Sequence, residues 1–263
     1  MKRIIAMVMV FAAVCGGCEE AKKEQQAKGP TTRPAKKRAT LPAAKTKADQ
    51  GALRHVVLFK FKDDAAPDKV KAVEEAFAAL PGKVSRIKAF EWGTDVTKGA
   101  RTDGFTHCFL VTFADAAGRK IYLPHPDHKA FGKLLGPVLD KVLVIDYFRG
   151  KWGRKPPESK AHEGKLRHLV LWNFKVGATV EQIKAVEDGL AELAKNIPEI
   201  IDFEWGTNAS VEGLARGYTD AVLVTFEDEK GLDVYLPHQA HQGFVKILTP
   251  VMGDLLVIDY VAK

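Results

Sequence analysis

The chain repeats itself at a fixed offset of 113 residues. Residues 54–148 align with residues 167–261 without a gap, and about 42 of the 95 aligned pairs are identical. A period this long, present in two copies, excludes a solenoid of short repeats and predicts two duplicated domains. We place repeat 1 at residues 51–150, a Gly- and Pro-containing linker at 151–166, and repeat 2 at 167–263.

The hydrophobic pattern of repeat 1 predicts the elements of one small α+β domain. Runs of β-branched and aromatic residues predict strands, and apolar residues spaced by three and four predict helices. Pro124 and Pro126 end one short helix, and Asp127 is a candidate N-cap for the next. The expected order is strand 54–62, helix 67–80, strand 87–92, strand 105–113, helix 115–122, helix 129–135 and strand 142–148.

This order is the ferredoxin-like βαββαβ arrangement. Four antiparallel strands with helices on one side leave the other face of the sheet uncovered, and an apolar face of that size needs a partner. The second repeat supplies that partner. We therefore predict that the two tandem ferredoxin-like repeats form an intramolecular dimeric α/β-barrel, monomeric overall, because a linked duplication reproduces a two-fold homodimer.

The N-terminus has the parts of an export signal. Lys2-Arg3 precedes the apolar run 4–14, and Gly16-Gly17 precede Cys18, as in the signal of bacterial lipoproteins. We expect residues 1–17 to be a signal peptide, with lipidation at Cys18; cleavage and secretion without a lipid is the alternative. Residues 18–50, rich in Lys, Ala and Pro, predict a disordered charged tether. The implied location is the cell envelope, lipid-anchored on the periplasmic side or at the cell surface.

Charge and cysteines exclude several classes of function. Residues 1–50 hold eleven Lys/Arg and four Asp/Glu, a net charge of +7 that equals the charge of the whole chain, so the folded part is neutral. A nucleic-acid partner is therefore not predicted. Cys108 stands in an apolar run typical of a buried core residue. His125 and His128 form an H-x-x-H pair without an adjacent glutamate or third ligand, so we assign no metal.

One polar segment recurs in both repeats. Tyr122-Leu-Pro-His-Pro-Asp-His128 returns as Tyr235-Leu-Pro-His-Gln-Ala-His241. Phenol and imidazole groups donate and accept hydrogen bonds, and imidazole also carries protons near neutral pH. A histidine among apolar side chains stays neutral and can accept a proton, while a tyrosine hydroxyl can bind a carbonyl or enolate oxygen. The segment is thus either a site or a way of turning the chain, and we expect His125 to hold the turn.

The sequence resembles the stress-responsive A/B barrel (Dabb) family. The resemblance rests on the strand that begins near His55, the Glu91-Trp92-Gly93 turn, the 122–128 segment and the closing Val-Ile-Asp-Tyr at 144–147. It covers about 190 residues and both repeats, and it implies a dimeric α+β barrel. Many members have no known reaction. The plant olivetolic acid cyclase closes a linear polyketide by an aldol step, with a tyrosine and histidines in a pocket between sheet and helices.

The resemblance also implies roles for individual residues. Tyr122 matches a substrate-orienting tyrosine and His128 a general base, with Tyr235 and His241 as their counterparts. The residues expected to line the ligand pockets are His55, His107, Phe59, His168 and Trp172. Asp220 stands where repeat 1 has His107, so we do not expect identical chemistry in both repeats. Asp146 and Asp259 are interpreted as turn or strand-edge partners. No cofactor is assigned, although haem stays open by analogy at the level of fold.

Three functions stay open at this point. The first is binding of a small, mostly apolar molecule that carries a polar group. The second is cyclase- or isomerase-like proton transfer by His128 and His241, which requires room for a substrate beside the base. The third is a protein-interaction module in an envelope stress response.

Overall fold

The computed structural model describes residues 51–99, 101–149 and 162–263. The expected signal peptide, the tether with Cys18 and residues 151–161 of the linker lie outside the described residues. Within the described ranges, no helix combines the length and the apolar character needed to span a membrane.

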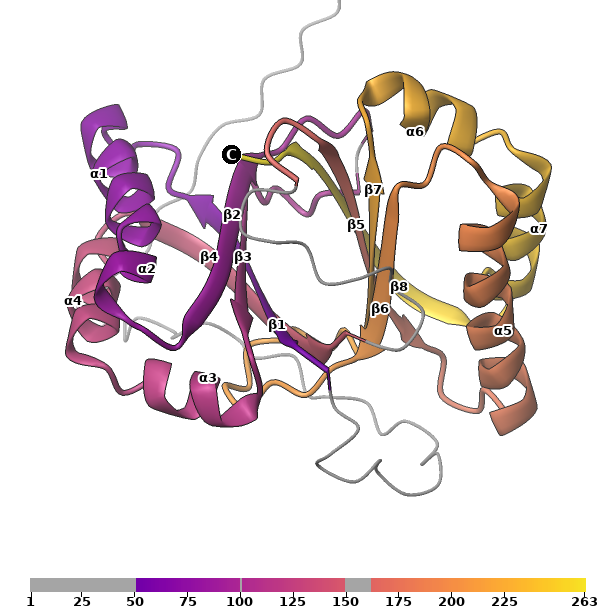
Figure 1. Ribbon diagram of the computed structural model, residues 1–263, viewed down its shortest axis with the longest axis horizontal. Helices are drawn as coiled ribbons and strands as arrows, with labels where there is room; N and C mark the ends of the chain where they lie inside the picture. The colour runs from indigo at the N-terminus through magenta and orange to yellow at the C-terminus, as the bar shows by residue number, and fades with distance from the viewer. Residues whose placement is uncertain (1–50, 100, 150–161) are drawn as a thin grey trace, which may run out of the picture. The chain divides into compact units, whose positions relative to one another are not determined.

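Repeat 1 folds in the predicted βαββαβ order, with each of its two helical segments split in two (Figure 1). Its strands form an antiparallel sheet in the order β2-β3-β1-β4. The elements are β1 (Leu53–Phe61), α1 (Pro67–Ala78), α2 (Leu80–Lys83), β2 (Ile87–Thr94), β3 (His107–Phe113), α3 (Ala116–Tyr122), α4 (Pro126–Leu135) and β4 (Leu139–Phe148).

Repeat 2 has the same topology, with the sheet order β6-β7-β5-β8. Its first helix is continuous, whereas the matching helix of repeat 1 is interrupted at Ala79, two residues before Pro81, which lacks the N–H that a helix interior needs. The elements are β5 (Leu166–Phe174), α5 (Val180–Asn196), β6 (Asp202–Thr207), β7 (Asp220–Phe226), α6 (Glu229–Tyr235), α7 (Gln239–Leu248) and β8 (Met252–Val261).

The start of α4 differs from the prediction. The helix begins at Pro126, so the capping position falls on His125 rather than on Asp127. Proline suits the first helical position because its φ is preset and its missing N–H has no partner there anyway. His125 Nδ1 accepts a hydrogen bond from the backbone N–H of Asp127 at 3.3 Å, and His238 caps α7 in the same way at 3.1 Å. Both histidines therefore hold the turn, as expected for His125.

In each repeat the helices cover one face of the sheet, as Figure 1 shows for α1, α2 and α4 and for α5 and α7. The helix-side core of repeat 1 is aromatic: Phe77 stacks on Phe109 with ring centroids 4.5 Å apart, and Phe59 lies 5.2 Å from Phe109. The side chain of Trp172 belongs to the corresponding core of repeat 2. Phe59 and Trp172, expected to line the ligand pockets, are thus buried within the two cores.

The opposite faces of the two sheets pack on each other, as predicted. One buried hydrophobic cluster contains Val56, Leu58 and Ile145 of repeat 1 together with Leu169 and Ile258 of repeat 2. Buried Cys108 also belongs to it, and burial raises the pKa of its thiol. Phe105 lies in this cluster too. It was expected to open the strand 105–113, but β3 starts only at His107, so Phe105 is outside the strand.

Edge strands of one repeat meet edge strands of the other. Lys263 N donates to Trp92 O at 2.8 Å, and Ala209 N donates to Asp146 O at 2.6 Å. Leu214 O accepts from Val144 N at 3.1 Å. The segment that follows β6 in repeat 2 therefore runs beside β4 of repeat 1, which lets repeat 2 contribute side chains to a site in repeat 1.

Candidate functional site

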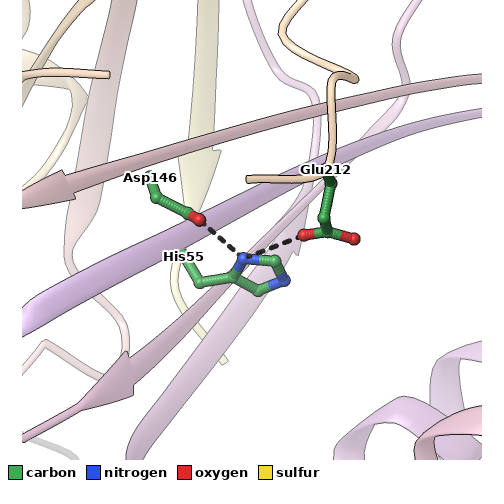
Figure 2. A group of neighbouring side chains, drawn as sticks. All are labelled: His55, Asp146 and Glu212. Carbon is green, nitrogen blue, oxygen red and sulfur yellow. Dashed lines mark hydrogen bonds and ion pairs between the residues drawn. The ribbon is translucent and has the colours of Figure 1, made fainter. Parts of the chain in front are cut away.

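The site in repeat 1 is centred on a buried histidine–aspartate pair. His55 on β1 and Asp146 on β4 are cross-strand partners in the sheet. His55 Nδ1 donates to Asp146 Oδ1 at 2.6 Å, and both residues are at most 2% exposed (Figure 2). Asp146 lies on the edge strand β4, as expected. It is nevertheless fully buried, because Arg119 of α3 and Asn208 of repeat 2 contact it.

Arg119 of α3 supplies the positive charge beside this carboxylate. Its guanidinium donates to Asp146 Oδ2 and, at 2.8 Å, to the carbonyl oxygen of Ala209 from repeat 2. Burial alone would raise the pKa of Asp146, but the hydrogen bond from His55 and the charge of Arg119 outweigh it and hold this pKa below its usual value. Asp146 is therefore ionised and fixes the tautomer of His55.

Glu212 brings a second carboxylate from repeat 2. Its Oε1 lies 3.8 Å from His55 Nδ1, and burial raises the pKa of this carboxyl. One ligand atom from each of His55, Asp146 and Glu212 lies within 4.8 Å of the others, which is a spacing that could hold a cation. Arg119 already pairs with Asp146 and occupies one oxygen of its carboxylate, so we assign no metal here.

Tyr122 and His128 stand next to this group. The Tyr122 ring lies 5.8 Å from the His55 ring and 4.2 Å from the His128 ring. His128 Nδ1–H donates to the backbone oxygen of Leu123 at 3.0 Å, which leaves Nε2 as the acceptor. Burial lowers the pKa of His128 and so keeps its ring neutral.

The hydroxyl of Tyr122 is buried and has no hydrogen-bond partner among the described residues. Burial raises the pKa of this phenol, so it stays protonated and can act as a donor. The site therefore combines an unused O–H donor with a neutral imidazole that offers a lone pair.

Repeat 2 copies this arrangement only in part. The Tyr235 ring lies 5.8 Å from His168 and 4.2 Å from His241, whose Nδ1–H donates to a backbone oxygen at 2.9 Å. His168 donates to Asp259 at 2.6 Å. The charged neighbours differ, because Leu232 stands in the place of Arg119 and Gly99 in the place of Glu212.

His107 lies apart from the other histidines of repeat 1. It is the cross-strand partner of Phe59, whereas the partner of His55 is Val111, four residues further along β3. His107 Nε2 contacts Glu74 at 2.9 Å. The structure thus places together His55, Tyr122 and His128, and it separates His107 from them.

Sequence reasoning interpreted Asp146 as a turn or strand-edge partner, and it missed Arg119 and Glu212. A signal for Asp146 was available, since a histidine and an aspartate recur 91 residues apart in both repeats. Arg119 and Glu212 occur in one repeat only, and no motif marks them.

A family profile described as the stress responsive A/B barrel domain matches residues 53–149 and 166–262. The chain belongs to the stress-responsive A/B barrel family. A/B barrel protein HS1 of Arabidopsis thaliana is 39% identical over 98 residues, which cover 37% of this chain and 90% of HS1. Olivetolic acid cyclase of Cannabis sativa is 30% identical over 96 residues, 36% of this chain and 95% of the cyclase.

A solved structure extends the likeness to both repeats. An anthrone oxidase-like protein superposes with a TM-score of 0.58 over 82% of this chain and 93% of its own, at 13% identity. At that identity the likeness concerns the A/B barrel fold alone. It agrees with the two sheets packed face to face.

Proposed function

We propose that repeat 1 binds a small, mostly apolar molecule through a carbonyl group that accepts a hydrogen bond from Tyr122. The observation that carries this proposal is the buried Tyr122 hydroxyl, which has no hydrogen-bond partner in the part of the chain that the structure describes. A buried polar group left unpaired destabilises the protein by about 1–3 kcal/mol. A ligand oxygen that accepts the Tyr122 hydrogen bond removes this penalty, which favours binding.

The surroundings set the character of the ligand. The ring of Phe113 lies 5.2 Å from Tyr122, and the ring of Phe131 lies 6.4 Å from His128. Aromatic walls favour an apolar body. The carboxylates of Asp146 and Glu212 outnumber the single charge of Arg119, which disfavours an anion. A neutral ketone or ester fits these constraints best.

A second candidate function is proton transfer beside that carbonyl. It is favoured by the neutral His128, whose Nε2 lone pair is available because Nδ1 binds Leu123 O. His128 would take a proton from the carbon next to the carbonyl, while Tyr122 stabilises the enolate oxygen. Return of the proton to another carbon gives an isomerase. The aldol chemistry of the cyclase named above would need a second carbonyl in the same substrate.

One experiment separates binding from catalysis. The full chain is incubated with 2-nonanone in D₂O; native mass spectrometry reports binding, and NMR reports deuterium at the carbons beside the ketone. We expect Tyr122→Phe to reduce binding about tenfold, the loss of one hydrogen bond. His128→Gln should abolish any deuterium exchange. Tyr147→Phe is the matched control, because it removes another buried hydroxyl that lacks a partner within residues 51–99, 101–149 and 162–263, outside this site. Equal binding by the Tyr122 and Tyr147 variants contradicts the proposal, and binding without exchange leaves only the binding function.

We propose further that Cys18 is lipidated and that residues 18–50 tether the barrel to the cell envelope. The support is the apolar run 4–14 that ends before Cys18. Radiolabelled palmitate should label the wild-type chain and not Cys18→Ser. Export of an unlabelled wild-type chain contradicts the lipid anchor.

A further inference from the structure

Repeat 2 contains a pocket of about 260 Å³ beside the His168–Asp259 pair. Its walls come from α6, from the strands β5 and β8, and from a segment of repeat 1. Asp259 of β8 is one of the lining residues and is 5% exposed. The pocket is separate from the site of Tyr122 and His128, so its function does not depend on the function proposed for that site.

The pocket lies where repeat 1 holds the guanidinium of Arg119. Three lining residues, Val96, Leu232 and Asp259, are the counterparts at the 113-residue offset of Ala209, Arg119 and Asp146. There the Arg119 guanidinium joins the carboxylate of Asp146 to the backbone carbonyl of Ala209, which comes from repeat 2.

The backbone around the two places is the same. Val96 N donates to Asp259 O at 2.8 Å, just as Ala209 N donates to Asp146 O at 2.6 Å. The carboxylates also match, because Asp259 and Asp146 each accept from a histidine at 2.6 Å. The decisive difference is at one position of the short helix, where a leucine in α6 replaces the arginine of α3 and leaves the carboxylate without a guanidinium.

The residues around the pocket are also more negatively charged than their counterparts in repeat 1. At three positions of the short helix the formal charge goes from +2 in repeat 1 to −2 in repeat 2. The residues are Ala116, Arg119 and Lys120 in α3, and Glu229, Leu232 and Asp233 in α6. Asp228 also lines the pocket. Lys98 is the one cation among the lining residues; it pairs with Glu229 and its side chain is 75% exposed, so it lies at the rim.

We propose that this pocket binds a small organic cation, an alkylguanidinium or alkylammonium, whose head group pairs with Asp259. The ligand takes the place that the side chain of Arg119 fills in repeat 1. Its alkyl part contacts Leu232, Leu166 and Leu236 on the walls. A carboxylate and a guanidinium form charge-assisted hydrogen bonds, which are stronger than neutral ones and select the cation over a neutral molecule of the same shape.

The test compares n-butylguanidinium with n-butylurea, which has nearly the same shape and no charge. Calorimetric titration of the full chain should give a Kd for the cation at least about tenfold below that for the urea. Leu232→Arg should abolish binding of the cation, because the new side chain fills the pocket as Arg119 does in repeat 1. Asp259→Asn should remove the preference for the cation.

The matched control is Val234→Arg. Val234 is 46% exposed on the same helix, so this variant adds the same charge to α6 outside the pocket. It should retain the cation preference, with Kd within about threefold of wild type, since an exposed charge is screened by solvent. Equal affinity for both probes in the wild type, undiminished binding by Leu232→Arg, or a preference that persists in Asp259→Asn overturns the proposal.

Discussion

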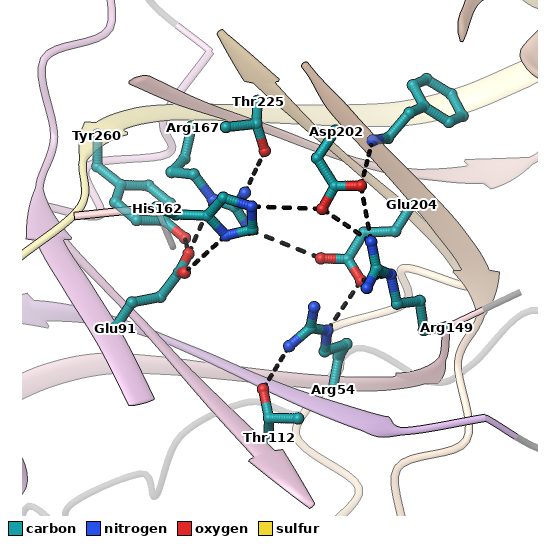
Figure 3. Close-up of polar contacts among 11 residues, drawn as sticks. Arg54, Glu91, Thr112, Arg149, His162, Arg167, Asp202, Glu204, Thr225 and Tyr260 are labelled. Atoms are coloured by element: carbon teal, nitrogen blue, oxygen red, sulfur yellow. Dashed lines mark hydrogen bonds and ion pairs between the residues drawn. The ribbon is translucent and has the colours of Figure 1, made fainter. Parts of the chain in front are cut away.

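Arg54 of repeat 1 binds Glu204 of repeat 2 across the interface, with Nε 2.8 Å from Oε2 (Figure 3). The same contact occurs with the roles of the repeats exchanged, because Arg167 Nε lies 2.8 Å from Glu91 Oε1. Arg54 and Arg167 are counterparts at the repeat offset, and so are Glu91 and Glu204. The two ion pairs are therefore related by a pseudo-two-fold axis, as the contacts of a symmetric homodimer would be.

Glu204→Gln should lower the free energy of unfolding by about 3–5 kcal/mol, because it leaves Arg54 buried without its carboxylate. The side chains of this pair are only 3% and 1% exposed. The double variant Arg54→Met, Glu204→Leu should recover only part of that loss, because Glu204 also lies 3.3 Å from Arg149 Nε. Asp188→Asn breaks an exposed pair with Lys184 and serves as the control, with a change within about 0.5 kcal/mol. Urea denaturation measures all of them, and equal losses for the buried and the exposed pair contradict the prediction.

Glu91 should make the free energy of unfolding depend on pH in the acid range. Burial would raise its pKa, but the charge of Arg167 and hydrogen bonds from His162 and Tyr260 lower it to about 2 from 4.5. The folded state thus binds this proton less tightly than the unfolded state, so the stabilisation is complete above pH 4.5 and is lost as the pH falls towards 2. The contribution is on the order of 3 kcal/mol. Denaturation of Glu91→Gln from pH 7 to 2 should show a flatter profile than wild type; parallel profiles contradict this.

Tyr147 and Tyr260 occupy matching positions, and removal of their hydroxyls should have unequal effects. Tyr260 donates to Glu91 at 2.9 Å, whereas the Tyr147 hydroxyl is buried without a partner among the described residues. Tyr260→Phe should cost about 1.5–3 kcal/mol, the value of a bond to a charged group. Tyr147→Phe should be neutral or stabilising by up to about 1 kcal/mol. Thermal denaturation of both variants tests this prediction. Equal losses of stability would show that the Tyr147 hydroxyl makes a hydrogen bond as strong as that of Tyr260.

The fold could be predicted because its determinants are repeated and local. Apolar alternation and spacing define the strands and helices, and the duplication supplies the partner for each open sheet face. The errors arose where one residue changes the local geometry. Pro126 moves the N-cap from Asp127 to His125, and Pro81 divides a helix that is continuous in repeat 2.

The candidate site was less predictable, because much of it comes from contacts between the repeats. Tyr122 and His128 stand in one recognisable segment and do lie together. Arg119 and Glu212 reach the site from α3 and from the other repeat, at separations that no motif records. His107 shares a strand face with Val111, the partner of His55, yet four residues along a strand are enough to separate it from the site.

Asp146→Asn and Asp259→Asn should differ although both disrupt a bond from a histidine. Asp146 also neutralises Arg119, which is 7% exposed, so its removal leaves a buried cation and should cost about 3–5 kcal/mol. Asp259 has Leu232 in that place, and its loss should cost about 1–2 kcal/mol. Arg119→Leu added to Asp146→Asn should restore part of the loss. Equal effects of the two single variants in urea denaturation contradict the role given to Arg119.

Gly93 of β2 lies close to the backbone of β8 in the other repeat, and Gly93→Ala should therefore destabilise the protein. A Cβ at this position would lie 2.5 Å from Val261 O and 2.8 Å from the Tyr260 ring, and a backbone oxygen in a strand cannot easily move away. We expect a loss of about 2 kcal/mol or more from this overpacking. Gly206→Ala, whose Cβ would lie 2.9 Å from Phe148 O, should cost less. Gly132 in α4 has open space around it, so Gly132→Ala should stabilise by about 0.5–1 kcal/mol. Chemical denaturation should rank the three variants in this order, and a Gly93→Ala protein as stable as the wild type would mean that β2 and β8 lie further apart than the structure places them.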